Sequence, residues 1–557
     1  MKKIIFIAIA IFAISLTGCK IPKEFIDAIK QNPAPAEYHA GKVNVTFEGN
    51  FPEKYFNKRM TMSVTPVIRM QDGTEIKGNS VFYQGEKVKG NDDVIRYKVG
   101  GKYRQTASFD YVEGMEDADI YLYATIYTKK KVYNLEPVKI SHGINITPLL
   151  VSTDAGTGNL SAILMKDSFQ RVIEQNVNSH IMYLINQSAI RETELSKDEM
   201  QFMINVIKSF ENDSTRIMKG IEIDSYASPD GSYEFNERLA GNRMNSAERY
   251  IRKQLRKANV NTDINSTVTP EDWDNFMKLV EASDIEDKHV IIRILNMYND
   301  PDEREAEIKK LAIAYEEIAN SILPELRRSK VSLTVNIIGK SDEEIKRFAE
   351  NDIEKLNENE ILYAATLVDD MSEKQMIYAK ATYQYPNSIR SFNNLGYTYY
   401  EQRKYDDAKA CFEKALTIDS TNAIINYNMG LVMLVTNNIE DAKTYFGKAG
   451  KLKKSLKPVY GTISLINGDY KKASPLFGKD ISNNAALANI LNKDYADARR
   501  ILNSIENPNA TTYYLKAILA ARTNDKDSYN ENMKKACDMD QNLCNRSEAD
   551  VEFENIR

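Results

Sequence analysis

A repeat with a period of 34 residues constrains the fold of this chain more than any other feature of the sequence. The clearest unit places small and aromatic residues at fixed spacings, namely Phe392, Leu395, Gly396, Tyr399, Ala408, Phe412 and Ala415. Adding 34 to four of these positions gives Gly430, Ala442, Phe446 and Ala449. Small residues recur where two helices touch closely, and aromatic residues fill the gaps between helices. The pattern therefore predicts stacked helix pairs.

This spacing resembles the tetratricopeptide repeat, with Phe392 in place of the usual leading tryptophan. The resemblance implies an all-α solenoid over residues 355–557, with about five or six helix pairs and a concave face. A later unit keeps Gly461, Ala473 and Phe477 at the same spacings but carries Pro475 in its second helix.

The first helix of each pair is expected to line the groove of this solenoid. Its polar positions outside the packing pattern are candidates for binding an envelope protein: Asn393, Asn394, Thr398, Asn426 and Asn428. Asparagines there suit hydrogen bonding to the backbone of an extended or helical peptide. The alternative is that they are solvated and the array is only a spacer.

The N-terminus carries the features of a secretory signal. Lys2 and Lys3 precede an apolar run from Ile4 to Leu16, which is shorter than the about 20 residues of a membrane-spanning helix. Leu16-Thr17-Gly18-Cys19 resembles a bacterial lipobox, which implies removal of residues 1–18 and lipidation of Cys19, including a fatty acid such as palmitate. Lys20 after the cysteine favours a lipid-anchored position in the outer membrane, and the stretch Lys20-Ile21-Pro22-Lys23-Glu24 lacks an acidic surface-export signal, so we expect the protein to face the periplasm. The alternative is an ordinary signal peptide with a chance cysteine.

Residues 19–40 are expected to form a stiff, lipidated tether, because Pro33 and Pro35 stand among small residues. From 41 to 150, apolar and polar residues alternate between turn signals such as Gln71-Asp72-Gly73. This pattern predicts an antiparallel β-sandwich, whose simplest role is a packing or spacer module.

Two stretches, IMYLINQSAIRETEL at 181–195 and IEIDSYASPDGSYEFNERLAGNRMNSAERYI at 221–251, resemble the OmpA-like domain. That family is an α/β sandwich that in many relatives binds peptidoglycan. The resemblance implies an OmpA-like domain over 160–342 with a helical insertion at about 262–330. Trp273 in the insertion is expected to be a packing anchor, and a sugar-stacking platform is the alternative.

The family binds diaminopimelate through an aspartate in a strand-to-helix turn and an arginine on the helix. The resemblance therefore points to a candidate peptidoglycan site at Ser228, Asp230, Asn236 and Arg243. Arg243 falls on the arginine position, where a guanidinium would bind a carboxylate. The aspartate position falls on Ser228, whose hydroxyl cannot supply a charge. Asp230, or Asp224 in the preceding strand, is a possible substitute.

The remaining composition excludes several classes of function. A net charge of −5 does not indicate nucleic-acid binding. The sequence contains no HExxH, P-loop, GxGxxG or GxSxG motif and no zinc spacing of cysteines. We therefore expect no enzyme activity, no metal and no cofactor. Cys411 is expected to be a small packing residue, whereas Cys537 and Cys544 could pair or remain thiols.

Taken together, the fold class is multidomain α+β: a β-sandwich, an OmpA-like α/β sandwich with a helical insertion, and an all-α tetratricopeptide solenoid. The leading functional hypothesis is a non-catalytic envelope lipoprotein that engages peptidoglycan or another envelope component and recruits a protein partner. The alternative is a surface or assembly scaffold whose OmpA-like pocket no longer binds peptidoglycan. Arg243 favours the first hypothesis and Ser228 favours the second.

Overall fold

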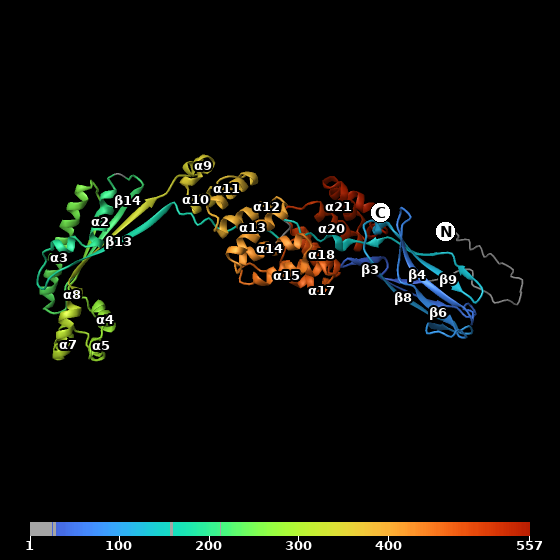
Figure 1. Cartoon of the computed structure of the whole chain (residues 1–557), viewed down its shortest axis with the longest axis horizontal. Coiled ribbons are helices and arrows are strands. Elements are labelled where there is room, and N and C mark those ends of the chain that lie inside the picture. Colours follow the sequence, from blue (N-terminus) through green and yellow to red (C-terminus); the bar gives the residue numbers. More distant parts are fainter. Residues whose placement is uncertain (1–24, 26–28, 156–159, 212) are drawn as a thin grey trace. The chain divides into compact units, whose positions relative to one another are not determined.

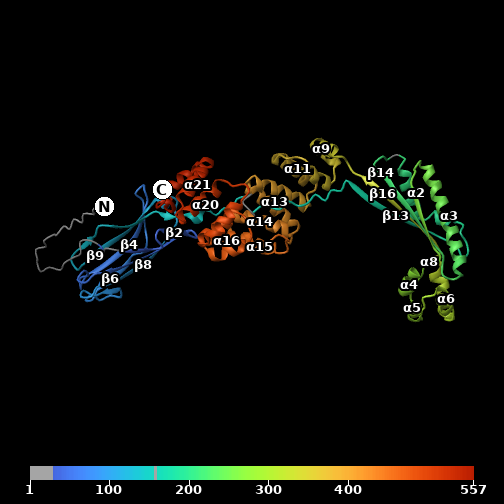
Figure 2. The ribbon, with the colours of Figure 1, turned by 180° about the vertical axis from the view of Figure 1, so that it is seen from behind.

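A computed structural model describes residue 25 and residues 29–155, 160–211 and 213–557. The signal sequence and Cys19 lie outside the described residues. The chain divides into two compact units (Figures 1 and 2), one formed by the residues up to Lys166 together with Asp370–Arg557, and one formed by Asp167–Asp369. In the described part of the chain, no helix combines the length and apolar character needed to cross a membrane.

The N-terminal region of the first unit is a β-sandwich with two sheets. One sheet has the order β1-β3-β2-β12, with β8 also paired to β3, and the other has the order β10-β9-β4-β6-β7, with β11 on β9 and β5 on β4. The strands are β1 (Lys30–Asn32), β2 (Ala36–His39), β3 (Lys42–Phe51), β4 (Thr61–Arg69), β5 (Glu75–Lys77), β6 (Val81–Gly85), β7 (Asp93–Ile95), β8 (Gly101–Asp110), β9 (Asp119–Tyr127), β10 (Val132–Asn134), β11 (Val138–His142) and β12 (Ile144–Asn145).

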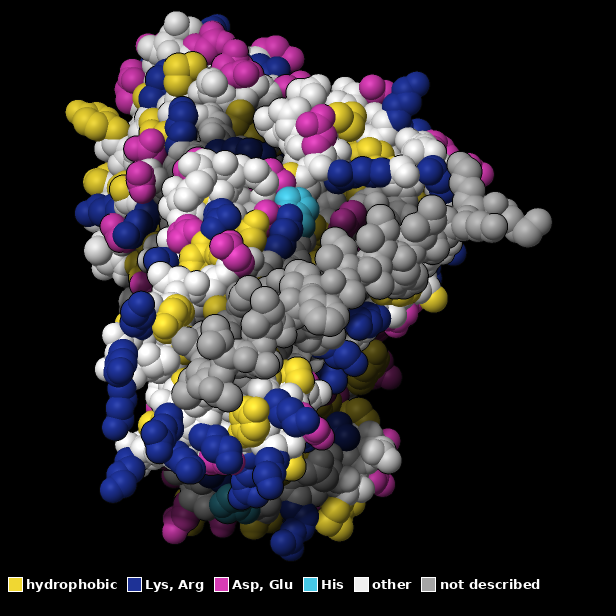
Figure 3. All heavy atoms as spheres, turned by 90° about the vertical axis from the view of Figure 1, so that its right-hand side faces the viewer, with side chains coloured by type: hydrophobic (Ala, Val, Ile, Leu, Met, Phe, Trp, Pro, Cys, Tyr) yellow, Lys and Arg dark blue, Asp and Glu magenta, His cyan; other side chains and the backbone are white. Residues whose placement is uncertain are grey.

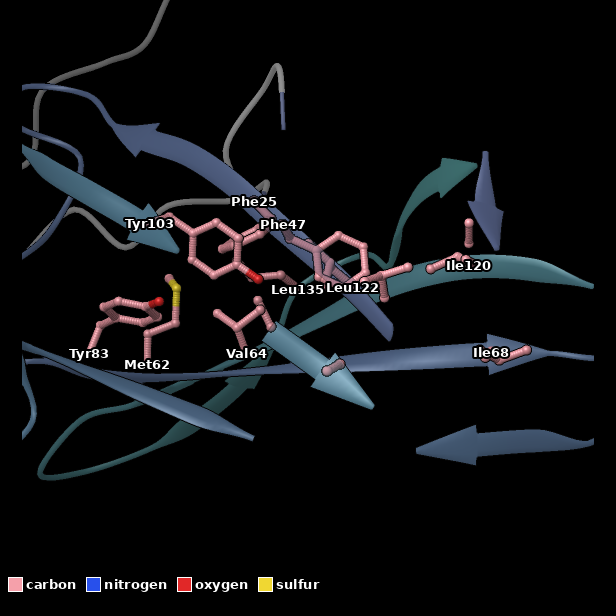
Figure 4. Close-up of a cluster of buried hydrophobic side chains, with 14 of the residues drawn as sticks. Phe25, Phe47, Met62, Val64, Ile68, Tyr83, Tyr103, Ile120, Leu122 and Leu135 are labelled. Carbon is pink, nitrogen blue, oxygen red and sulfur yellow. The ribbon is translucent and has the colours of Figure 1, made fainter. Parts of the chain in front are cut away.

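The alternation in the sequence explains the core of the sandwich. Phe47 and Tyr103 from one sheet pack with Met62 and Leu122 from the other, and all four side chains are at most 1% exposed (Figure 4). Burying one face of each strand in this way removes apolar surface from water and leaves the polar face solvated.

The expectation that residues 19–40 form a tether is wrong for its second half. Strands β1 and β2 pair with β3, and Phe25 is only 3% exposed because it packs against Phe51 and Tyr103. The backbone of this stretch finds partners on the edges of β3, and Phe25 adds its ring to the core. Any free tether therefore ends before Phe25.

The C-terminal region of the first unit is all helical, as the repeat predicted (Figure 1). Five helix pairs follow α11 (Met371–Gln384): α12 (Ile389–Glu401) with α13 (Tyr405–Ile418), α14 (Ala423–Val435) with α15 (Ile439–Lys448), α16 (Lys457–Ile466) with α17 (Tyr470–Phe477), α18 (Asn483–Leu491) with α19 (Tyr495–Ser504), and α20 (Ala510–Arg522) with α21 (Lys526–Met539). Helix α22 (Gln541–Ala549) and a 3-10 turn, η5 (Val551–Phe553), end the chain. The boundary expected at 355 lies instead near Asp370, because the residues before it pack with the second unit.

The small residues of the repeat stand where the two helices of a pair meet. A Cβ atom added to Gly396 would lie 2.6 Å from the ring of Phe412, and one added to Gly430 would lie 2.6 Å from the ring of Phe446. The glycines are therefore required by close helix packing.

The second unit is built on a four-stranded sheet with the order β13-β16-β14-β15, in which β14 and β15 are parallel and the other neighbours antiparallel. Its strands are β13 (Val172–Met182), β14 (Arg216–Tyr226), β15 (Ile264–Thr269) and β16 (Arg328–Ile338), and α1 (Glu192–Leu195), α2 (Asp198–Ser209) and α3 (Tyr233–Lys257) connect them. Ile204 and Ile207 of α2 and Ile251 of α3 are buried with Ile223 and Val331 of the sheet. Helices α9 (Asp342–Asn351) and α10 (Glu358–Ala364) follow the last strand.

The helical insertion is shorter than expected. Residues 264–269 form β15, so the insertion comprises α4 (Trp273–Ala282), α5 (Lys288–Met297), α6 (Pro301–Lys309), α7 (Ala312–Glu317) and α8 (Leu323–Leu326). Strand β15 lies at the edge of the sheet, and its sequence INSTVT has few apolar residues. It therefore lacks the alternation that would have predicted a strand. Trp273 packs on Phe276, with ring centroids 5.3 Å apart, as expected of a packing anchor.

The domain boundary expected at 160 is also displaced. Residues 160–166 belong to the first compact unit, and the first strand of the second unit begins at Val172.

Candidate functional site

The groove-side asparagines of the solenoid bind an extended segment of the same chain. Asn394, on α12, accepts a hydrogen bond from the Met165 N–H at 2.9 Å and donates to the Met165 carbonyl at 3.0 Å. Asn428, on α14, does the same with Ile163, at 2.7 and 2.9 Å. Because a primary amide has one acceptor and one donor side, each asparagine satisfies both backbone polar groups of one residue.

A third asparagine repeats this geometry. Asn484, on α18, accepts from the Ser152 N–H at 3.0 Å and donates to the Ser152 carbonyl at 2.7 Å. The sequence analysis missed Asn484, although a signal was available. It stands two residues before Ala486, as Asn394 stands two residues before Gly396 and Asn428 two before Gly430. We call Asn394, Asn428 and Asn484 the asparagine clamps.

Residues 150–155 and 160–165, here called the clasp segment, run against the order of the repeats. The earlier residue Ser152 binds the later helix α18, whereas Ile163 and Met165 bind α14 and α12. Leu160, Ala162 and Met165 are at most 9% exposed and pack into the solenoid core, and the Tyr400 hydroxyl donates to the Leu160 carbonyl at 3.0 Å. Apolar burial and these backbone hydrogen bonds together hold the segment.

The structure places the other predicted partner-binding residues differently. The Asn393 amide donates to the Ile163 carbonyl at 3.0 Å and accepts from Asn428, so it supports a clamp. Thr398 donates to Leu395, and Asn426 donates to the carbonyls of Ser420 and Asn422, so both bond within their own repeat. The interpretation of this face as solvated is wrong, since all five side chains are at most 1% exposed. That these residues bind a separate protein stays a prediction.

Hydrogen bonds to one member of a buried ion pair join the sandwich to the last helices of the solenoid. Arg522 pairs with Glu552, and Glu552 also accepts from Asn145 at 2.7 Å and from Thr147 at 2.8 Å. Burial by itself would raise the pKa of Glu552, but the hydrogen bonds and the Arg522 charge outweigh it and leave the pKa below its ordinary value. The carboxylate therefore remains ionised within this junction at neutral pH.

In the second unit, Arg243 is completely buried. Its guanidinium donates to the backbone carbonyls of Gln187 at 3.0 Å, Tyr226 at 2.9 Å and Leu184 at 3.3 Å. Burial lowers the pKa of Arg243 to about 10. The guanidinium joins two backbone segments, the turn at Leu184 and Gln187 and the end of β14 at Tyr226, which is a structural role rather than that of an open carboxylate receptor.

The acidic partner expected for a ligand ammonium is also engaged. Asp230 accepts from the Ser228 hydroxyl at 2.6 Å and pairs with Arg327 at 3.1 Å, while Arg327 also donates to Ser228 at 3.2 Å. The Asn236 amide donates to the Gly231 carbonyl at 3.0 Å. Asp224, the other candidate acid, accepts from Thr267 in β15. The four predicted site residues thus lie near one another but are bonded within the chain.

The described cysteines lie outside both sites. Cys537 and Cys544 form a disulfide with their Cα atoms 4.6 Å apart. Cys411 is a free, half-buried thiol, and burial raises its pKa to about 12. Within the described residues, no cluster of His, Cys, Asp and Glu side chains could hold a metal ion.

Comparisons with known proteins identify the repeat. Residues 389–422 match the family described as Tetratricopeptide repeat. No curated protein matches the chain. Among solved structures, a tetratricopeptide repeat protein from Parabacteroides merdae is 18% identical, with 38% of this chain and 91% of that chain covered and a TM-score of 0.31. Pseudomonas aeruginosa PilF is 18% identical, with 39% and 97% covered and a TM-score of 0.29. The repeat at 389–422 indicates protein–protein interaction.

Proposed function

We propose that this protein is a non-catalytic scaffold lipoprotein of the cell envelope, anchored through Cys19, that acts by protein–protein interaction. In this proposal the second unit is an OmpA-like domain whose pocket does not bind peptidoglycan. The strand order β13-β16-β14-β15 and the turn-to-helix segment at 226–243 support the family resemblance. The choice between scaffold and peptidoglycan binder depends on the charged residues of the pocket.

One observation carries the proposal: both charges expected to bind diaminopimelate already have partners in the chain. Arg243 is bonded to three backbone carbonyls, and Asp230 is paired with Arg327. A ligand would have to replace these bonds, and leaving a buried polar group without a partner costs about 1–3 kcal/mol, or more for a charged group. The charged groups that a ligand would need are therefore already neutralised or hydrogen-bonded by residues of the same chain.

The solenoid has a defined role in this scaffold. Its inner face binds the clasp segment, which connects the sandwich to the second unit along the chain. A partner protein then either uses another surface of the solenoid or displaces the clasp segment. Because the clasp segment fills this face, its binding to the solenoid is part of how the scaffold is assembled.

The pocket is tested by sedimentation of the full chain with purified peptidoglycan. We expect no sedimentation of the wild type and none of Asp230→Asn. Asp230→Asn is chosen because the Asp230 side chain is partly exposed, whereas Arg243 is buried and its removal would disturb the fold. Sedimentation of the wild type that Asp230→Asn abolishes, with an unchanged circular dichroism spectrum, would contradict the scaffold proposal.

The anchor is tested separately. Cells that express the wild type should incorporate radioactive palmitate into the protein, and cells that express Cys19→Ala should not. Equal labelling of the two proteins would remove Cys19 as the lipid attachment site, without affecting the interpretation of the pocket.

A further inference from the structure

One end of the β-sandwich concentrates positive charge. Three stretches, 52–60, 86–102 and 128–131, contain eleven Lys and Arg residues and four Asp and Glu residues, a net charge of +7 in a chain whose total is −5. We call these stretches the basic end. Every one of their basic side chains is exposed except that of Lys58, which is half-buried. Figure 3 shows Lys and Arg side chains gathered on the face that includes this end.

Strand pairing brings the three stretches together. Phe51 pairs with Gly101, Thr61 with Tyr127, and Gly85 with Ile95, so the loops that follow or precede these residues meet at one end of both sheets. The backbone N–H of Lys87 donates to the carbonyl of Lys58 at 2.8 Å. The charge is thus clustered by the fold and not only by the sequence.

The basic end also exposes apolar and aromatic side chains. They are Phe82 at 43% exposed, Val94 at 51%, Val99 at 69%, Tyr127 at 40% and Val132 at 60%. Among the residues that the structure describes, Lys129, Lys130 and Lys131 form no ion pair, whereas Lys58 is paired with Glu86 at 3.1 Å. Exposed apolar side chains beside unpaired lysines are typical of surfaces that bind in the headgroup region of an anionic membrane.

Two further facts, within the part of the chain that the structure describes, agree with a membrane-facing position of this end. The contacts of the sandwich with the solenoid come from its opposite end, where His39 lies against Tyr470 and Asn145 binds Glu552. Phe25 packs against Phe51 and Tyr103, beside the basic end, and Cys19 precedes it by six residues. Six extended residues span about 20 Å at most.

We infer that the basic end docks on the phosphate-bearing surface of the membrane that carries the lipid anchor, with lysines against headgroup phosphates and Val99 and Val132 in the apolar boundary. This extends the proposed lipoprotein function and depends on it for the position of the anchor. The docking surface gives the scaffold a fixed orientation, with the sandwich against the membrane and its opposite end bound to the solenoid.

The inference is tested with the unlipidated chain from Lys20 to Arg557, so that binding reports the surface and not the acyl chains. Its partition is measured by co-sedimentation with vesicles of phosphatidylcholine, with and without phosphatidylglycerol. The test variant is Lys129→Glu/Lys130→Glu/Lys131→Glu. The matched control is Lys451→Glu/Lys453→Glu/Lys457→Glu, which makes the same charge change at exposed lysines of the solenoid.

We expect the wild type and the control variant to bind vesicles that contain phosphatidylglycerol, and the test variant to bind about 100-fold more weakly, since each lysine near an anionic surface contributes severalfold. Val99→Asp should also weaken binding. The inference is overturned if the test variant binds as well as the wild type, if the control variant loses as much, or if the wild type binds neutral vesicles equally well. Palmitate labelling tests the anchor independently, so failure of one claim is distinguishable from failure of the other.

Discussion

Asn428 holds both backbone polar groups of Ile163, accepting from its N–H at 2.7 Å and donating to its carbonyl at 2.9 Å. The two residues are 265 positions apart in the chain. This pair of hydrogen bonds and the equivalent pairs at Met165 and Ser152 place the chain's own backbone on the face where the sequence predicted a bound peptide. The asparagine clamps bind the backbone N–H and carbonyl groups and not the side chains. A segment of mixed sequence can therefore fill the groove.

Gly430→Ala should destabilise the solenoid by about 1–3 kcal/mol, because the new methyl group would overlap the Phe446 ring. Gly447→Ala is the matched control, since a Cβ there meets no atom within 4 Å in helix α15. Alanine in an open helical position should stabilise by about 0.5–1 kcal/mol. Urea unfolding of the full chain gives both values, and equal midpoints for the two variants would refute the close packing at Gly430.

Glu552→Gln should weaken the junction between the sandwich and the solenoid by about 3 kcal/mol at neutral pH, because Arg522 would be left buried without its counter-charge. The pKa of Glu552 in the folded chain lies below the ordinary value of 4.5. Its contribution to stability is therefore complete above pH 4.5 and is lost as the pH falls through the lower, folded pKa.

The measurement for this junction is urea unfolding of the wild type and Glu552→Gln at neutral pH and in steps down to about pH 3, below the ordinary pKa of a glutamate. The stability difference between the two proteins should be large at neutral pH and should shrink in acid. Glu554→Gln, an exposed change two residues away, serves as the control. A difference that does not depend on pH would show that the Glu552 charge is not involved.

Thiol labelling of the native chain from Lys20 to Arg557 should modify none of its cysteines quickly. Cys537 and Cys544 are joined, and burial raises the pKa of the Cys411 thiol to about 12, which leaves little reactive thiolate at neutral pH. Unfolding without a reductant should expose one thiol, and unfolding with a reductant should expose three. Mass spectrometry that finds three thiols without reduction would disprove the disulfide.

Local patterns predicted the parts of this fold that depend on local packing. The spacing of Gly396 and Phe412 predicted paired helices because those two residues touch across a short turn. Strand β15 was not predicted because an edge strand with polar residues has no strong alternation, and β1 and β2 were not predicted because strands of three and four residues are too short to show one. Boundaries at 160 and 355 were displaced because contacts distant in sequence decide which unit a residue joins.

The sequence predicted the kind of hydrogen bond that the asparagines make, but not the residues to which they bind. The asparagines on the first helices indicated hydrogen bonding to an extended backbone, and the bonds are present. Nothing near Asn394 in the sequence identifies Met165, 229 residues earlier, as the residue it binds. Arg243 was likewise identified as important from its family position, but its three carbonyl partners come from backbone segments that only the folded unit brings together.

Hydrogen exchange at the backbone amides of Ile163 and Met165 tests the clasp most directly. In the wild-type chain we predict slow exchange at both amides, because each donates a hydrogen bond to a clamp. In Asn394→Ala/Asn428→Ala both should exchange at least about fivefold faster, since loss of one partner of such a hydrogen bond costs about 1 kcal/mol or more. Asn426→Ala, a buried asparagine that bonds only within its own repeat, should leave them protected. Rapid exchange at Ile163 and Met165 in the wild type, or equal protection in the double variant, would contradict the claim that the solenoid holds its own chain.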